Sequence, residues 1–175
     1  MEKDIKIKID EKCFIRILNK DDVTDNYVMW LNDYEVTKYT EQKYVEHHLK
    51  SVHDYVKQKY ESGSDLLFGI FHHNVHIGNV KLGPIKWQHK STEISYFIGD
   101  KTYWGKGIAS KVIKKVVEYG ADILRLEKFN AGYHELNIGS ARVFQKCGFC
   151  IEGVKKGDFI FEGRRINSIL VGYQP

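Results

Sequence analysis

Apolar and polar residues alternate with a period of two in several segments of the first half of the chain, and this alternation is typical of β-strands. The sequence His72-His73-Asn74 stands between two such segments, so we predict a β-hairpin that turns there. The two segments nearest the N-terminus predict an opening strand or hairpin, and the last one completes an antiparallel meander. The segments are 5–9, 13–18, 66–71, 75–82 and 93–98.

Apolar residues spaced three and four apart predict helices between the strands. The first helix follows Asp21 or Asp22, either of which can cap it, and a second helix follows before residue 66. A long helix begins after Gly107, and a short one over residues 140–147 is closed by Gly148. The apolar faces of the first three are Val23, Tyr27, Trp30 and Leu31; Val45, Leu49, Val52, Val56 and Tyr60; and Ile108, Val112, Val116 and Tyr119.

Further strand patterns lie in the C-terminal part of the chain, at 124–131, 149–154 and 159–171. The resulting order is β, α, α, β, β, β, α, β, α, β, β, which is an α+β arrangement. The chain has 175 residues, two prolines, and no Ser/Gly-rich or repeated stretch that would mark a linker. We therefore expect a single domain over residues 1–175.

Composition and charge narrow the classes of function. Hydrophobic residues make up 42% and charged residues 29%, a balance typical of a folded globular protein. The net charge of +4 suits an anionic ligand but is too small for a nucleic-acid-binding surface. No apolar run is long enough to cross a bilayer, and the N-terminus has no signal-peptide pattern. We expect a cytoplasmic protein with no nucleic-acid or membrane partner.

The cysteines and histidines do not form a recognisable metal or redox motif. The cysteine count is three, and Cys147-x-x-Cys150 spans a predicted helix end and strand start, so we interpret these residues as structural thiols. The pair His47-His48 and the group His72-His73-x-x-His76 have no carboxylate or thiolate at ligand spacing. We therefore expect no metal.

Gly105-Lys106-Gly107 connects the strand predicted at 93–98 to the long helix. Glycines let a ligand approach the backbone closely, and the free N–H groups and positive dipole end of the helix converge there. Lys106 and Lys111 add positive charge. The segment is neither a Walker loop nor a GxGxxG fingerprint, because it lacks the third glycine and Lys106 is not followed by Ser or Thr. It predicts a phosphate-binding loop, unless its glycines only turn the chain.

A second segment, from Asn137 to Phe149, begins with residues that favour helix capping and ends at a glycine before a strand. Together with Trp104-Gly105-Lys106-Gly107-Ile108-Ala109 it resembles the acetyl-CoA-binding core of the GNAT superfamily of N-acetyltransferases. The family pattern Arg/Gln-x-x-Gly-x-Gly/Ala is matched with Trp104 at its first position. The resemblance extends to the RimJ/RimL-like (ribosomal-protein N-acetyltransferase) branch through Trp30-Leu31-Asn32-Asp33, Glu93-Ile94-Ser95-Tyr96-Phe97-Ile98 and Lys146-Cys147-Gly148-Phe149.

The resemblance implies an α+β GNAT fold, with a mixed, mostly antiparallel, V-shaped sheet of seven strands flanked by four helices. It also implies acetyl-CoA as co-substrate, with the pyrophosphate on the glycine loop and the acetyl carbonyl held by a backbone N–H of Phe97 or Ile98. Asn137 and Ser140 are expected to face the pantetheine arm. The implied cofactor-binding residues are Phe97, Ile98, Trp104, Gly105, Lys106, Gly107, Ile108, Ala109, Ser110, Asn137, Ser140, Phe144 and Lys146.

Acetyl transfer to an amine requires a neutral amine and a leaving thiolate. Glu93, at the start of its strand, is the candidate general base, although it could also be a solvated strand-edge residue or part of a structural ion pair. His89 is an alternative base. Many relatives have a tyrosine acid where this chain has Phe144. We therefore expect Ser140, a water molecule or bulk solvent to protonate the thiolate, or the product to leave as thiolate, with catalysis chiefly by positioning.

The resemblance implies that residues 27–60 and the late hairpin at 153–165 build the acceptor pocket. The first region is rich in tyrosine and the second in polar or basic residues, and together they suit a sugar attached to a nucleotide diphosphate as well as a peptide end. We rank a small-molecule or sugar-nucleotide amine first, a protein N-terminus or lysine second, and a non-catalytic CoA-binding regulator third. The protein is expected to be a monomer or homodimer. The residues in question are Tyr27, Tyr34, Tyr39, Tyr44, Tyr55, Lys155, Lys156, Arg164 and Arg165.

Overall fold

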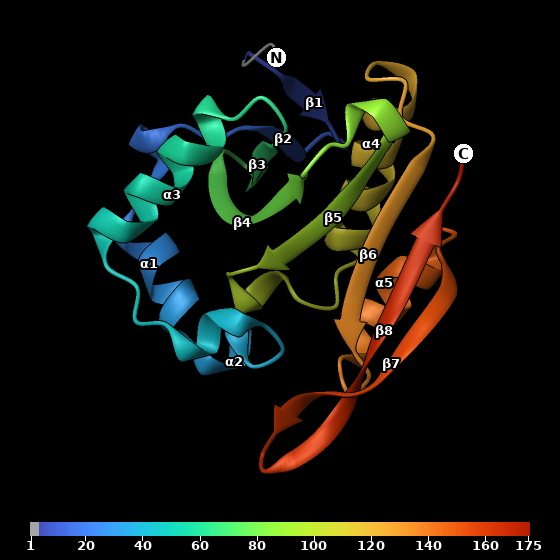
Figure 1. Ribbon diagram of the computed structural model, residues 1–175. Coiled ribbons are helices and arrows are strands. Elements are labelled where there is room, and N and C mark those ends of the chain that lie inside the picture. Colours follow the sequence, from blue (N-terminus) through green and yellow to red (C-terminus); the bar gives the residue numbers. More distant parts are fainter. Residues whose placement is uncertain (1–3) are drawn as a thin grey trace.

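The computed structural model describes residues 4–175, and its strands form one mixed sheet in the order β1-β2-β3-β4-β5-β6-β8-β7 (Figure 1). Every neighbouring pair is antiparallel except β5 and β6. The bounds are β1 Lys6–Lys8, β2 Cys13–Ile17, β3 Leu66–His72, β4 Val75–Leu82, β5 Ser91–Ile98, β6 Lys128–His134, β7 Cys150–Phe161 and β8 Arg164–Tyr173.

The sheet opens between β5 and β6. Their pairing runs only from Ser91 opposite Lys128 to Glu93 opposite Asn130, after which β5 pairs with β4 alone and β6 with β8 alone. The two halves diverge from that point, which confirms the predicted V-shaped sheet. It has eight strands among the described residues instead of seven, since β1 and β2 are both strands and add a hairpin at the edge of the sheet.

Helices cover both faces of the sheet (Figure 1). Helices α1 (Asp25–Asn32), α2 (Tyr34–Thr37) and α3 (Leu49–Glu61) lie on one side, and α4 (Ile108–Asp122) and α5 (Ile138–Lys146) lie on the other. The α-helices of residues 4–175 number five and not four, since the short α2 has no apolar periodicity by which a sequence pattern would identify it. The predicted α+β class is confirmed.

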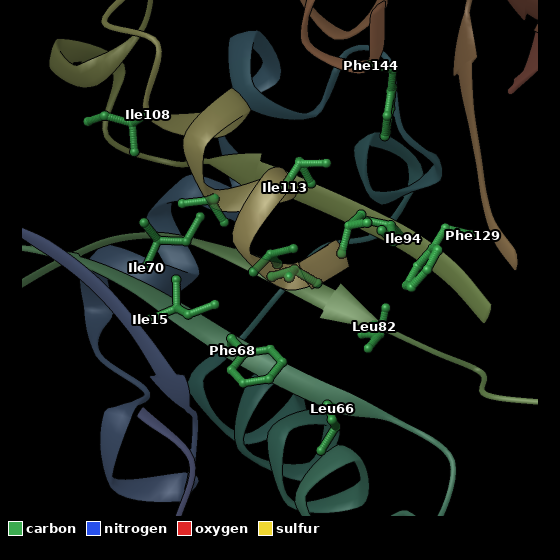
Figure 2. Packing of buried hydrophobic residues seen from close by; sticks show 14 of the residues in the cluster. Ile15, Leu66, Phe68, Ile70, Leu82, Ile94, Ile108, Ile113, Phe129 and Phe144 are labelled. Atoms are coloured by element: carbon green, nitrogen blue, oxygen red, sulfur yellow. The ribbon is translucent and has the colours of Figure 1, made fainter. Parts of the chain in front are cut away.

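The larger core cluster lies between α4 and the sheet (Figure 2). Val112, Ile113 and Val116 of α4 are fully buried against strand residues such as Phe68 and Ile94. A smaller cluster joins α1 and α3 to the other face through Leu18, Val23, Tyr27, Val52, Val56, Leu67 and Phe71. Burial of each such side chain contributes roughly 1.5–3 kcal/mol, so both helical layers are firmly attached to the sheet.

The start of α1 differs from the prediction. Asp21 and Asp22 belong to a short 3₁₀ helix that Asn19 caps, and the Asp22 carboxylate accepts hydrogen bonds from the Arg16 guanidinium. The cap of α1 is Thr24, whose hydroxyl accepts a hydrogen bond from the Tyr27 N–H at 3.4 Å. The predicted aspartate cap was therefore wrong, because an ion pair with the neighbouring strand engages Asp22.

Two other boundaries were misplaced in the sequence analysis. Strand β6 begins at Lys128, because residues up to Glu127 reverse the chain after α4, with Arg125 at a φ of +57°. Residues 155–158, which resemble a turn, form a bulge inside β7 where Gly157 has a φ of +60°. The actual turn is at Glu162 and Gly163, with φ values of +49° and +76°.

The three cysteines are free thiols, in agreement with the sequence analysis. Burial raises the pKa of Cys13 to about 11. Cys147 donates a hydrogen bond to the Ser110 carbonyl at 3.3 Å, which links α5 to α4. None of the helices within residues 4–175 combines the length and apolar character that crossing a bilayer requires.

Candidate active site

The glycine loop has the conformation that an anion cradle requires. Gly105 and Gly107 have φ values of +74° and +75°, and a Cβ on either would meet no atom within 4 Å. Glycine is therefore needed for its backbone freedom and not for lack of space. Gly107 is the N-cap of α4 and supplies no side chain to the first turn, so the N–H groups at the start of α4 are available to a ligand.

The side chains around this loop have distinct roles. Trp104 donates its indole N–H to the Ile98 carbonyl at 2.8 Å, which ties the loop to the end of β5. Lys111 pairs with Asp10 at 2.7 Å, and this hydrogen bond is the main reason why the pKa of Asp10 falls to about 2. Lys106 is exposed, with its ammonium 5.2 Å from the Tyr103 ring, and Ile108 is buried in the core. Ile108 can therefore meet a ligand only through its backbone.

The hydrogen-bonding pattern of β5 distinguishes between the two candidate donors for the acetyl carbonyl. Gly99 donates its N–H to Ile77 of β4, and Glu93 accepts from Gly83, so the odd-numbered residues of β5 direct their backbone groups to β4. Alternation therefore directs the N–H of Phe97 to β4 and that of Ile98 into the opening of the V. This geometry favours Ile98 over Phe97 as the backbone donor.

The start of α5 faces the same opening. Asn137 caps the helix by accepting the Ser140 N–H on Oδ1 at 3.0 Å, and Ser140 Oγ accepts a hydrogen bond from the Tyr96 hydroxyl at 3.3 Å. Burial raises the pKa of Tyr96 to about 12. The structure thus places Asn137 and Ser140 in one hydrogen-bonded turn and adds Tyr96, which was part of a recognised motif but was given no role. Contact of Asn137 and Ser140 with the pantetheine arm stays a prediction.

Two residues predicted to bind the cofactor occupy different surroundings. The Phe144 ring is buried in the core, with its centroid 5.8 Å from the Tyr96 ring and 5.1 Å from the Phe149 ring. Lys146, on the last turn of α5, is exposed. Contact of either residue with the cofactor stays a prediction.

Glu93 is exposed at the last position where β5 and β6 are paired, directly opposite Asn130. Because side chains alternate along a strand, Glu93 shares a face with Ser95, which lines the cavity described below. The other candidate base, His89, lies in a 3₁₀ helix before β5, at the end of the strand away from the glycine loop. The placement favours Glu93 over His89.

A cavity of about 410 Å³ lies between the α1–α3 side and strands β3–β5. Among the described residues that line it, Lys81 is the only lysine or arginine, and there is no aspartate or glutamate. Of the five candidate tyrosines, Tyr27 and Tyr55 line this cavity. The lining residues are Tyr27, Leu31, Val36, Thr37, Thr40, Gln42, Val45, His47, Ser51, Val52, Tyr55, Leu67, Asn79, Lys81, Ser95, Tyr96 and Phe97.

No residue of the late hairpin is among the described residues that line the cavity. The Tyr44 hydroxyl donates to the Ile160 carbonyl at 3.4 Å, and the Tyr39 ring stacks on Phe161 at a centroid distance of 5.4 Å. These contacts attach the far end of the β7–β8 hairpin to the segment after α2. The hairpin's part in acceptor binding stays a prediction.

The motif at 30–33 connects the cavity to the glycine loop. Trp30 packs directly on Gly99, and Asp33 pairs with Lys101 while its other carboxylate oxygen accepts the Glu35 N–H. Asn32 holds the backbone of His47, a cavity residue, with hydrogen bonds of 2.8 and 2.9 Å. Sequence reasoning recognised this motif but did not identify these contacts.

The packing of Trp30 on Gly99 gives a testable prediction. A Cβ at Gly99 would lie 2.1 Å from the indole, so Gly99→Ala must displace Trp30 and α1. We expect a loss of about 1–3 kcal/mol in the free energy of unfolding, measured by urea denaturation. Gly63→Ala, where a Cβ meets nothing within 4 Å, is the control. Equal stabilities of the two variants would show that the contact is not tight.

Comparison with known proteins agrees with this geometry. The family described as "Acetyltransferase (GNAT) domain" matches residues 13–150. The probable N-acetyltransferase YjcK of Bacillus subtilis (strain 168) is 34% identical over 122 residues, covering 68% of this chain and 66% of that protein. The spermidine N(1)-acetyltransferase of Escherichia coli (strain K12) is 30% identical over 92 residues, covering 53% of this chain and 49% of that protein.

The fold is shared with solved acetyltransferases. The structure of RimL, a ribosomal L7/L12 alpha-N-protein acetyltransferase in complex with coenzyme A, matches with a TM-score of 0.85 at 16% identity, covering 97% of this chain and 98% of that one. The matches to the two curated relatives span about half to two thirds of their length. The chain belongs to the GNAT family of acetyltransferases, which confirms the resemblance seen in its motifs.

Proposed function

We propose that this protein transfers an acetyl group from acetyl-CoA directly to the primary amine of a small molecule, with amino sugars, including nucleotide-linked ones, as the acceptor class. The observation that carries the acceptor class is the absence of carboxylates from the cavity lining within the described chain, where Lys81 is present instead. An amine held there meets neutral and aromatic groups and one cation. This lining suits an acceptor that carries hydroxyl or phosphate groups besides its amine.

A polyamine fits this cavity poorly. Spermidine and spermine carry several ammonium groups, and binding them away from water requires carboxylates or other acceptors at matching positions. The similarity to the E. coli spermidine enzyme covers about half of each chain. The described lining of this cavity, with Lys81 and no carboxylate, does not favour a polycation. The family relationship therefore supports acetyl transfer, while the cavity supports a different amine.

In the proposed reaction, the N–H groups from Gly105 to Ser110 hold the pyrophosphate, and the Ile98 N–H stabilises negative charge on the acetyl oxygen. Acetyl-CoA, when bound, supplies an activated thioester. Glu93 accepts a proton from the acceptor ammonium, directly or through water, so that the neutral amine can attack. The opening between β5 and β6 connects the two sides, because β5 carries both Ile98 and the cavity residue Ser95.

The acceptor class is tested by measuring CoA release over a panel of amino sugars, sugar nucleotides, spermidine and peptide N-termini. We expect the highest kcat/KM for an amino sugar. The Lys81→Met variant should bind a phosphorylated acceptor about tenfold more weakly than the wild type does, because a single hydrogen bond to a charged group contributes on the order of 1.5–3 kcal/mol at most. The KM for acetyl-CoA should stay within about twofold.

Two outcomes would contradict the acceptor class. If spermidine were the best substrate, the acceptor would be a polyamine and not an amino sugar. If a peptide N-terminus were the best substrate, the protein-modifying alternative would be favoured. CoA binding without turnover on any amine would favour the third alternative, a non-catalytic regulator.

A further inference from the structure

We propose that Tyr96 is a positioning residue that fixes the hydroxyl of Ser140, so that the Ser140 proton is directed to the thioester sulfur and stabilises the leaving thiolate. The inference rests on the proposed acetyl transfer and adds to it a hydrogen-bonded pair that no single motif contains. The two residues come from β5 and α5, on opposite sides of the opening, and are 44 positions apart in sequence. Phe144, in the position where relatives carry a tyrosine, has no hydroxyl of its own to offer.

The direction of the hydrogen bond is the first step of the argument. Tyr96 donates its O–H to Ser140 Oγ at 3.3 Å. A serine hydroxyl has one proton and two lone pairs, so accepting from Tyr96 leaves its proton free for another acceptor. A tyrosine that accepted instead would consume that proton.

The phenol of Tyr96 is suited to donating a hydrogen bond to Ser140. Tyr96 is largely buried and packs edge-on against Phe144, which holds the ring in place. Because burial raises the pKa of Tyr96 to about 12, the phenol keeps its proton throughout the neutral range and acts as a donor. It is correspondingly a poor source of a transferable proton.

Ser140 is also fixed through its backbone. Its N–H is held by Asn137 Oδ1 at 3.0 Å in the first turn of α5. A serine in a helix often donates its hydroxyl proton to a carbonyl of the preceding turn, but within residues 4–175 the hydroxyl of Ser140 has the Tyr96 contact and no such bond. The proton of this hydroxyl is therefore available to a group bound in the opening, where the cofactor is expected.

The chemical step balances without proton transfer from either residue. The neutral amine nitrogen forms a bond to the acetyl carbon and releases one proton to water, and the carbon–sulfur bond breaks with its electron pair on sulfur. The Ser140 hydroxyl donates a hydrogen bond to that sulfur as the charge grows, and the thiolate takes its proton from solvent after it leaves. A charge-assisted hydrogen bond of this kind is stronger at the transition state than with the neutral thioester.

A double-mutant cycle tests the coupling. Tyr96→Phe and Ser140→Ala are each expected to lower kcat about fivefold, with the KM values for acetyl-CoA and acceptor within about twofold. The double variant should be no slower than Ser140→Ala alone, because Tyr96 acts only through Ser140. Tyr133→Phe is the control, since the Tyr133 ring also packs on Phe144, at a centroid distance of 6.3 Å, and it should keep full activity. Additive losses, or a fully active Tyr96→Phe, would overturn the proposal.

A second measurement does not depend on the acceptor. A hydrogen bond to sulfur favours the thiolate, so the affinity for CoA, relative to desulfo-CoA, should rise as the pH passes the thiol pKa of about 8.5. Calorimetry should show a smaller rise for Tyr96→Phe and for Ser140→Ala than for the wild type. An unchanged rise in both variants would refute the role of the pair, whereas failure to turn over any amine would refute only the proposed function.

Discussion

Replacing Gly107 by valine is expected to reduce the affinity for acetyl-CoA at least tenfold, about 1.4 kcal/mol, in a protein that still folds. Gly107 has a φ of +75°, a conformation that costs a β-branched residue roughly 1–2 kcal/mol or more. Relaxing that strain rotates the peptide groups that begin α4, and their N–H groups then no longer converge on one point. The added methyl groups also enter the open space above the loop, where phosphate oxygens should lie.

Gly163→Val is a matched control for this experiment. Gly163 has a φ of +76°, and a Cβ there also meets nothing within 4 Å, but it lies in the turn between β7 and β8. Both variants therefore suffer the same kind of backbone strain and should lose similar amounts of stability. Calorimetric titration should show the affinity loss for Gly107→Val alone. Equal affinities in the two folded variants would mean that the loop does not hold the pyrophosphate.

Elements whose formation depends on a short contiguous stretch of sequence were predicted from that stretch alone. The hairpin of β3 and β4 turns at His73 and Asn74, which adopt φ values of +49° and +64°, as the turn sequence indicated. The amphipathic pattern of α4 placed Val112 and Val116 in the core correctly. Helix α2 and the 3₁₀ helix Glu41–Tyr44 were missed because short segments provide too few residues for a period to be recognised.

Only those parts of the candidate site that lie within contiguous sequence motifs could be predicted. The glycine loop and the cap at Asn137 are encoded in contiguous residues, and both have the expected local geometry. The contact of Tyr96 with Ser140 depends on how far β5 and β6 diverge, and the packing of Trp30 on Gly99 depends on where α1 crosses the sheet. Such contacts follow from the assembled fold, so a sequence pattern could name the residues without pairing them.

The charge of the cavity that we propose for the acceptor could be known only from the fold. The sequence analysis predicts that the late hairpin supplies the basic residues of the acceptor site. In the structure the cation in the cavity lining is Lys81, which comes from β4. Lys81 faces the cavity because it is paired with Ser95 of β5, and this register could not be derived from alternation alone.

Replacing Glu93 by glutamine is expected to lower kcat about 100-fold while leaving the affinity for acetyl-CoA unchanged, because general-base catalysis typically contributes at least that factor. Glu93 lies where the sheet divides, on the face that carries Ser95, and therefore beside the expected path of the acceptor amine. Glu127→Gln is the matched control, since Glu127 is also exposed but pairs with Lys90 before β6 begins.

The pH dependence gives the same hypothesis a second, independent test. Removing a proton from the acceptor ammonium becomes easier as the pH rises, so kcat/KM should increase to a plateau. A tyrosine acid with an ordinary pKa of about 10 would add a falling alkaline limb. Here Phe144 cannot supply one, and burial raises the pKa of Tyr96 to about 12, beyond the range in which its ionisation would be seen. A bell-shaped profile with a limb near pH 10, or a Glu93→Gln enzyme at full rate with its true acceptor, would show that the proton leaves by another route.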